Sequence, residues 1–125
     1  KPGRPMAMGF WHDTPIFGLP GNPVAAATCA LIFVRPALSK FSGGKWLVPQ
    51  AYYMPAAFEK TKKAGRREFL RAKVCNNNVE IFKSEGSGLT SGLAWATGFV
   101  ELPDNEISVG FGDKVKYIPF SSYYF

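Results

Sequence analysis

The chain has 125 residues and carries 15 basic against 9 acidic side chains, a formal net charge of +6. With 46% hydrophobic and 15% aromatic residues it has enough apolar surface to fold around a core, which excludes a largely disordered protein. The longest nearly apolar run, residues 24–34, is much shorter than the ~20 residues that cross a bilayer, so we expect no membrane partner.

The first residues of the chain and its two cysteines indicate where the protein is found. The chain opens with Lys1 rather than Met, and this basic start runs into Pro and Gly instead of an apolar segment, so we expect no signal peptide here. We expect a cytoplasmic protein and interpret the sequence as a piece of a longer one. Cys29 and Cys75 lie far apart, without metal or redox spacing, and are expected to be reduced and buried.

The first 43 residues predict a strand–turn–strand, a loop and a helix. Two short apolar runs flank a polar turn around His12, and the loop at residues 18–23 contains two glycines and two prolines. Asn22 suits a helix N-cap and Pro23 the first helical position. The helix is expected over residues 24–40, with Pro36 either ending or kinking it. A strand–loop–helix of this kind is a unit of α/β domains.

From residue 44 onward the pattern changes to short β segments, which makes the fold class mainly β. Strands are expected within residues 46–58 and at 68–74, 79–82, 98–102 and 114–119, with a turn at Asn76–Asn78. Strands at this spacing indicate a small β-barrel or sandwich. We therefore predict two parts, residues 1–43 as the end of an α/β domain and residues 44–125 as a β-barrel domain.

One segment accounts for the whole net charge. Residues 60–73 contain seven basic and one acidic side chain, 7 − 1 = +6, and the rest of the chain is neutral. If residues 67–73 form a strand, Arg67, Phe69, Arg71 and Lys73 share one face. Such a face is either simply solvated or binds a polyanion, a nucleotide-like ligand or a nucleic acid.

Other candidate sites are less specific. The lysines before that strand, Lys60, Lys62 and Lys63, are interpreted as part of a solvated loop. The loop before Pro23 and the glycine-flanked Ser87 could each bind an anion or be ordinary connections. No catalytic triad, carboxylate pair or zinc spacing can be built from the sequence, so it predicts ligand binding without a reaction centre.

Five motifs in order resemble the C-terminal part of the molybdopterin molybdenumtransferases, the family of bacterial MoeA and the gephyrin E domain. They are KPGRPMAMG (1–9), IFGLPGNPV (16–24), FVRPALSKFSG (33–43), GRREFLRA (65–72) and EGSGLTSGLAWATGFVELP (85–103). The resemblance implies that residues 1–43 end a molybdopterin-binding α/β domain and that residues 44–125 form the C-terminal β-barrel domain. It also implies a homodimer that inserts molybdate into adenylylated molybdopterin in a Mg²⁺-dependent step, releasing AMP.

The resemblance also assigns ligand-binding residues. Lys1, Pro20 and Pro23 would border the molybdate and pterin site, and Arg71 and Ser87 would reach it from the barrel side. The family's catalytic and metal-binding aspartates lie upstream of Lys1, so no metal ligand is expected in this chain, and the isolated 125 residues are expected to be inactive. Ala25 stands where the family often has serine. The alternative that stays open is a small basic β-barrel that binds nucleic acid or serves as an interaction module.

Overall fold

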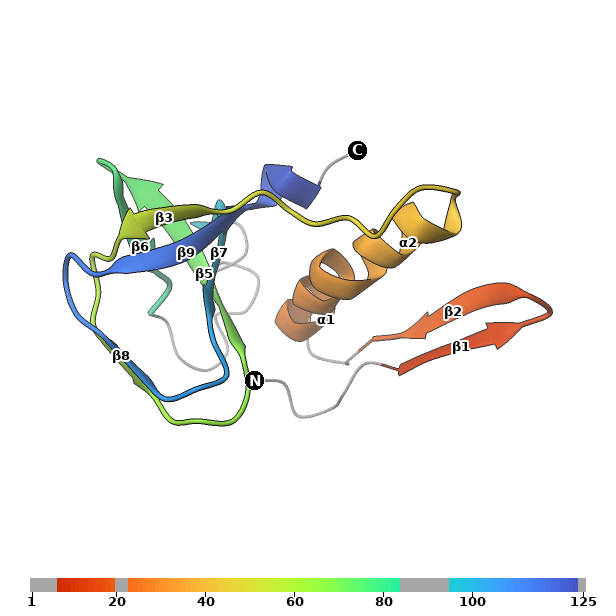
Figure 1. The fold of residues 1–125 in the computed structure, drawn as a ribbon, viewed down its shortest axis with the longest axis horizontal. Coiled ribbons are helices and arrows are strands. Elements are labelled where there is room, and N and C mark those ends of the chain that lie inside the picture. Colours follow the sequence, from red (N-terminus) through yellow and green to blue (C-terminus); the bar gives the residue numbers. More distant parts are fainter. Residues whose placement is uncertain (1–6, 20–22, 84–94, 124–125) are drawn as a thin grey trace. The chain divides into compact units, whose positions relative to one another are not determined.

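The computed structural model describes residues 7–19, 23–83 and 95–123. The chain divides into two compact units, residues 1–48 and residues 49–125, and each is described by itself (Figure 1). In neither unit does the described part include a helix with the length and apolar character needed to cross a membrane.

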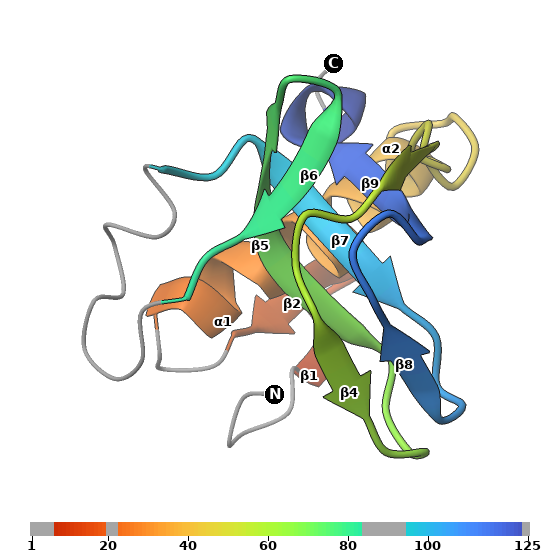
Figure 2. The same ribbon diagram turned by 90° about the vertical axis from the view of Figure 1, so that its left-hand side faces the viewer.

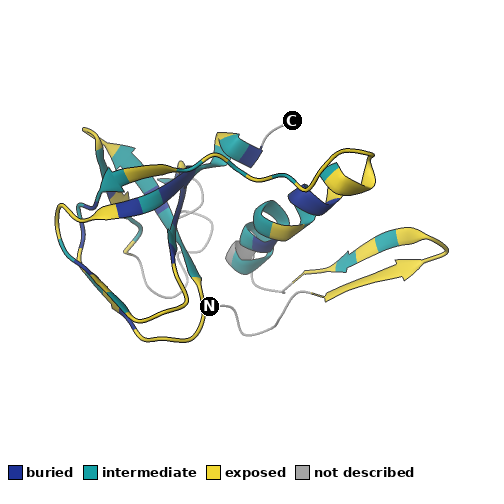
Figure 3. Cartoon of the chain, in the orientation of Figure 1, coloured by how far each residue is buried: buried dark blue, intermediate teal, exposed yellow. Residues whose placement is uncertain are grey.

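The first unit begins with an antiparallel hairpin of β1 (Ala7–Trp11) and β2 (Thr14–Gly18). The turn consists of His12 and Asp13, which both have positive φ angles, 48° and 66°. Two such residues are what a two-residue hairpin turn requires if it is to match the twist of its strands. The predicted strand–turn–strand is confirmed, and most residues of both strands are exposed (Figure 3).

A helical segment follows, formed by α1 (Pro23–Cys29), the π-helix η1 (Ala30–Val34) and α2 (Arg35–Phe41). Pro36 has no N–H to donate to the preceding turn, and the wider π turn lies directly before it. The helix therefore continues through Pro36 instead of ending there. It stops at Ser42–Gly44 as predicted, where Gly43 adopts a φ of 96° that favours glycine.

The second unit is built on a five-stranded antiparallel sheet and a two-stranded sheet. The five strands, in the order β3-β9-β7-β5-β6, are β3 (Tyr52–Pro55), β9 (Lys114–Pro119), β7 (Gly98–Leu102), β5 (Glu68–Cys75) and β6 (Asn78–Ile81). The smaller sheet pairs β4 (Lys60–Lys62) with β8 (Ile107–Val109), and the short 3-10 helix η2 (Phe120–Tyr123) follows β9.

The large sheet curls until its two outer strands meet. Ala56, directly after β3, forms a parallel bridge with Val79 of β6, and the Ala57 N–H donates to the Val79 carbonyl oxygen at 2.8 Å. Figure 2 shows the curl, with β4 and β8 side by side at one end of it. This arrangement confirms the prediction of a mainly β fold with a small barrel-like sheet.

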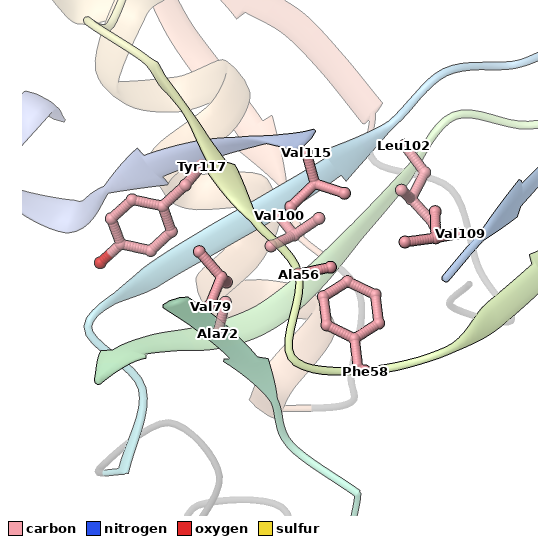
Figure 4. Packing of buried hydrophobic residues seen from close by; sticks show 9 residues of the cluster. All are labelled: Ala56, Phe58, Ala72, Val79, Val100, Leu102, Val109, Val115 and Tyr117. Atoms are coloured by element: carbon pink, nitrogen blue, oxygen red, sulfur yellow. The ribbon is translucent and has the colours of Figure 1, made fainter. Parts of the chain in front are cut away.

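Alternation along the strands determines which side chains fill the curled sheet. In β5 the inward residues are Leu70, Ala72 and Val74, and β7 adds Val100 and Leu102. The buried cluster is drawn in Figure 4 and comprises Ala56, Phe58, Ala72, Val79, Val100, Leu102, Val109, Val115 and Tyr117. Because side chains alternate between faces with a period of two, the intervening residues of β5, including Arg71, lie on the opposite face.

The expectation of a solvated loop is wrong for Lys60 and Lys62, whereas Lys63 is exposed and lies outside the strands. Lys60–Lys62 form β4 and pair with β8, and Lys62 is only 4% exposed. Its ammonium donates a hydrogen bond to the Lys63 carbonyl oxygen at 2.8 Å, so the buried ammonium has a backbone partner. The thiols also differ from expectation in part, since Cys29 is buried but Cys75 is exposed.

We predict that Gly98→Ala destabilises the second unit by about 1–3 kcal/mol, the usual cost of overpacking. A Cβ atom at Gly98 would clash with the Ile118 carbonyl oxygen and lie 2.8 Å from two ring carbons of Tyr117. That ring is fixed in place, since its hydroxyl lies 2.7 Å from the Thr97 hydroxyl. Chemical denaturation measures the loss.

The matched control is Gly110→Ala in the same unit. The nearest atom to a Cβ there is the Asp113 Oδ2 at 3.6 Å, an ordinary contact. Equal stability of the Gly98 and Gly110 variants would contradict the packing explanation.

Candidate functional site

The predicted site residues fall in different parts of the chain. Lys1, Pro20 and Ser87 lie outside the described residues. Pro23 is the first residue of α1, in the first unit, as its predicted role at the start of a helix requires. Arg71 is in the middle of β5, in the second unit, so the geometry of a candidate site can be built around it.

Arg71 faces outward from the curled sheet and lies against an aromatic ring. Its guanidinium carbon is 4.7 Å from the centroid of the Phe82 ring, within the range of a cation–π interaction. The Phe82 N–H donates to the Arg71 carbonyl oxygen at 3.0 Å, which fixes the two residues opposite each other just beyond β6. Backbone pairing therefore positions the ring that Arg71 contacts.

Lys73 has an equivalent arrangement two residues further along β5. Its ammonium lies 5.9 Å from the centroid of the Trp95 ring. Trp95 is held near β5 because the Thr97 N–H, two residues later, donates to the Ala72 carbonyl oxygen at 2.8 Å. Phe82 and Trp95 also contact each other, with ring centroids 5.6 Å apart. We call the set of Arg71, Lys73, Phe82 and Trp95 the β5 cluster.

Further along the same face, a carboxylate neutralises part of the charge. Glu101 of β7 forms ion pairs with Arg67 and with Lys116 of β9, each at 3.3 Å. The Glu101 side chain is 14% exposed and that of Arg67 59%. The Arg67 charge is thus partly satisfied within the protein by Glu101.

The charge of Glu101 also acts on the buried phenol of Tyr123. Tyr123 of η2 is almost fully buried. Its pKa is raised from 10.0 to about 12, mainly because burial disfavours the phenolate and secondarily because the Glu101 charge opposes it. Tyr123 therefore stays neutral over the physiological range and adds no charge to the face.

The sequence predicted Arg71 and Lys73 on one face with Phe69, and the structure agrees. Phe69 packs against Phe99, with ring centroids 6.0 Å apart. Sequence reasoning missed the partners Phe82, Trp95 and Glu101. Phe82 was missed because the predicted turn over Asn76–Asn78 is one residue too long, and Trp95 and Glu101 become neighbours of β5 only through long-range pairing.

No metal centre accompanies the β5 cluster. Within residues 7–19, 23–83 and 95–123, no three or more His, Cys, Asp or Glu side chains come together in a group that could hold a metal ion. The chemistry that the cluster can perform is the binding of an anion by a guanidinium and an ammonium, which donate charge-assisted hydrogen bonds to phosphoryl or other oxyanions.

Comparison with known proteins gives one family match. Residues 53–120 match the model of the family described as "MoeA C-terminal region (domain IV)", and this range includes the whole β5 cluster. The "Molybdopterin molybdenumtransferase" of Haemophilus influenzae is 32% identical over 97% of this chain. The "Molybdopterin molybdenumtransferase 2" of Mycobacterium tuberculosis is 30% identical over 93%.

A solved structure agrees with these relatives. The molybdopterin biosynthesis MoeA protein from Pyrococcus horikoshii superimposes with a TM-score of 0.79 at 28% identity, covering 96% of this chain and 30% of that one. The chain spans 31% of the Haemophilus relative and 29% of the Mycobacterium one, about a third of their length.

We predict that stability falls between pH 10 and pH 12 through Tyr123. Its folded pKa of about 12 lies above the value of about 10 for an exposed phenol. Its contribution is therefore complete below pH 10 and is lost as the pH rises through the folded value, because only the unfolded state ionises easily. Denaturant unfolding at several pH values, compared with Tyr123→Phe, isolates this contribution. Parallel pH profiles for the two proteins would contradict it.

Proposed function

The chain belongs to the family of the MoeA C-terminal region (domain IV), and from this premise we propose its function. The chain is the C-terminal part of a molybdopterin molybdenumtransferase and acts in molybdenum cofactor biosynthesis. The full-length enzyme inserts molybdate into adenylylated molybdopterin and releases AMP. The second unit contributes the cationic side of the site that holds this pterin nucleotide.

The observation that carries the proposal is the placement of Arg71. It lies within the matched residues, on the outward face of β5, with its guanidinium against Phe82. The planar guanidinium can donate two parallel hydrogen bonds to a phosphoryl group or to molybdate. Arg71 thus binds and orients the anion, and no proton transfer is assigned to it.

The other assigned residues are part of the same proposal. Lys1, Pro20, Pro23 and Ser87 would border the ligand, and the site would be completed in a homodimer. A Mg²⁺ ion does not fit the described residues, because they contain no cluster of suitable ligands.

Nucleic-acid binding is the less favoured alternative. It relied on the whole basic segment acting as one surface. Lys62 is buried and Arg67 is paired with Glu101, so the charge that faces a ligand is local. A small, highly charged ligand suits such a site better than a long polyanion.

We predict that this chain can replace the aligned region of the Haemophilus influenzae relative and support cofactor synthesis. Arg71→Ala in that chimera should lower its activity about 10- to 100-fold, because a charge-assisted hydrogen bond contributes about 1.5–3 kcal/mol. The measurement is restoration of molybdoenzyme activity in a strain that lacks the relative, followed by molybdate insertion by the purified chimera.

The control for this experiment is Arg66→Ala, which removes an exposed arginine from the same basic segment. It should leave insertion close to that of the unmodified chimera. A folded chimera without activity would contradict the proposed function. An active chimera that tolerates Arg71→Ala would contradict the role of Arg71.

We also predict that the 125-residue chain alone does not insert molybdate. Its described residues provide anion-binding side chains but no group of three or more His, Cys, Asp or Glu side chains that could hold a metal ion. The test is an insertion assay with adenylylated molybdopterin and molybdate, with the active chimera as positive control. Turnover by the purified chain would overturn this prediction.

A further inference from the structure

We propose that Lys73 is a specificity-determining residue that makes the site prefer two linked phosphoryl groups over one, and that Trp95 positions it. This inference rests on the proposed function, since adenylylation of a phosphate creates a ligand with two linked phosphoryl groups. It adds Lys73 and Trp95 to the site and assigns a role to each.

The spacing of the two cations supports a two-phosphoryl ligand. Arg71 and Lys73 lie on the same face of β5, and two residues of a strand advance by about 6.6 Å. Long side chains rooted at this spacing can converge on neighbouring phosphoryl groups, one cation to each. A single phosphoryl group would need only Arg71, so Lys73 adds affinity only when a second group is present.

The aromatic rings reduce the freedom of both cations. A lysine side chain has ~2 kcal/mol of rotamer entropy to lose when it binds a ligand. The ammonium of Lys73 already lies against Trp95, and the Trp95 ring is in contact with Phe82. The backbone bonds of Phe82 to Arg71 and of Thr97 to Ala72 tie both ring-bearing segments to β5.

The carboxylate nearest in register does not explain the position of Lys73. Glu80 of β6 is directly opposite Lys73 in the antiparallel pairing. A lysine that served only to pair with Glu80 would extend across the strands towards that carboxylate. Its ammonium instead lies 5.9 Å from the centroid of the Trp95 ring, and that ring contacts Phe82, the ring against which Arg71 lies. The ring contact also leaves the N–H donors of the ammonium available for oxygen atoms.

The test compares inorganic pyrophosphate with inorganic phosphate as probes, titrated calorimetrically into the 125-residue chain at low salt. We expect the wild-type chain to prefer pyrophosphate. Lys73→Gln should reduce the ratio of the two affinities about fivefold, as expected for one partly exposed charged contact. Lys73→Arg should retain the preference. Trp95→Leu should reduce it by a smaller factor, and Trp95→Phe should retain it because a ring remains.

The control is Lys114→Gln, which removes an exposed lysine of β9 and changes the net charge equally. An equal loss of preference in the Lys73 and Lys114 variants would assign the effect to overall charge and overturn the proposal. An unchanged ratio in Lys73→Gln would also overturn it.

Nuclear magnetic resonance supplies a readout of positioning that does not depend on affinity. The Lys73 side-chain protons next to the nitrogen should show an upfield ring-current shift that disappears in Trp95→Leu and persists in Trp95→Phe. Absence of this shift in the wild-type chain would overturn the role of Trp95.

The outcomes separate this inference from the proposed function. An inactive chimera with a Lys73-dependent pyrophosphate preference would remove the assigned reaction and retain the diphosphate site. An active chimera without that preference would retain the assigned reaction and remove the diphosphate site.

Discussion

Strand β5 contributes to two faces at once, and its pairing register decides which side chains go to which face. Leu70, Ala72 and Val74 pack into the core, while Arg71 and Lys73 point outward. A shift by one residue would turn the guanidinium and ammonium into the core, where each unpaired ion costs several kcal/mol. The burial of Ala72 and the packing of the partly buried Leu70 and Val74 against the core therefore enforce the outward position of the cations.

The hairpin turn after β5 carries this constraint to the next strand. The sequence predicted a turn over three asparagines, which would have placed Lys83 opposite Arg71. The turn instead has two residues, Asn76 and Asn77, with φ angles of 52° and 66°. It pairs Cys75 with Asn78, and Phe82 rather than Lys83 then bonds to the Arg71 backbone. Because a two-residue turn needs positive φ at both positions, which asparagine tolerates, local chemistry selects an aromatic partner over a repulsive one.

An element could be predicted when its own residues carry the pattern that forms it, and not when it depends on pairing with a distant segment. The strands at residues 68–75, 98–102 and 114–119 carry apolar side chains on alternate positions, and the sequence revealed all three. The Lys-Thr-Lys sequence of β4 has no such pattern, since it is a strand only through its pairing with β8. Lys62 could be buried there because its methylene stem is apolar and its ammonium reaches a backbone carbonyl. The contacts of Trp95 and Glu101 with β5 likewise depend on tertiary pairing, which no local pattern records.

The neighbours of each cation decide whether its charge can serve a ligand. A carboxylate takes up N–H donors, so Arg67 would have to weaken its bond to Glu101 before it could bind another anion. An aromatic face attracts a cation through its quadrupole and accepts no strong hydrogen bond from it, so it can orient a side chain while its donors stay directed outward. Arg71 and Lys73 both lie against rings, whereas Arg67 and Lys116 share one carboxylate. Within the basic segment, Arg67 thus helps to hold the sheet together through Glu101, whereas Lys73 lies against a ring and keeps its ammonium donors for a ligand.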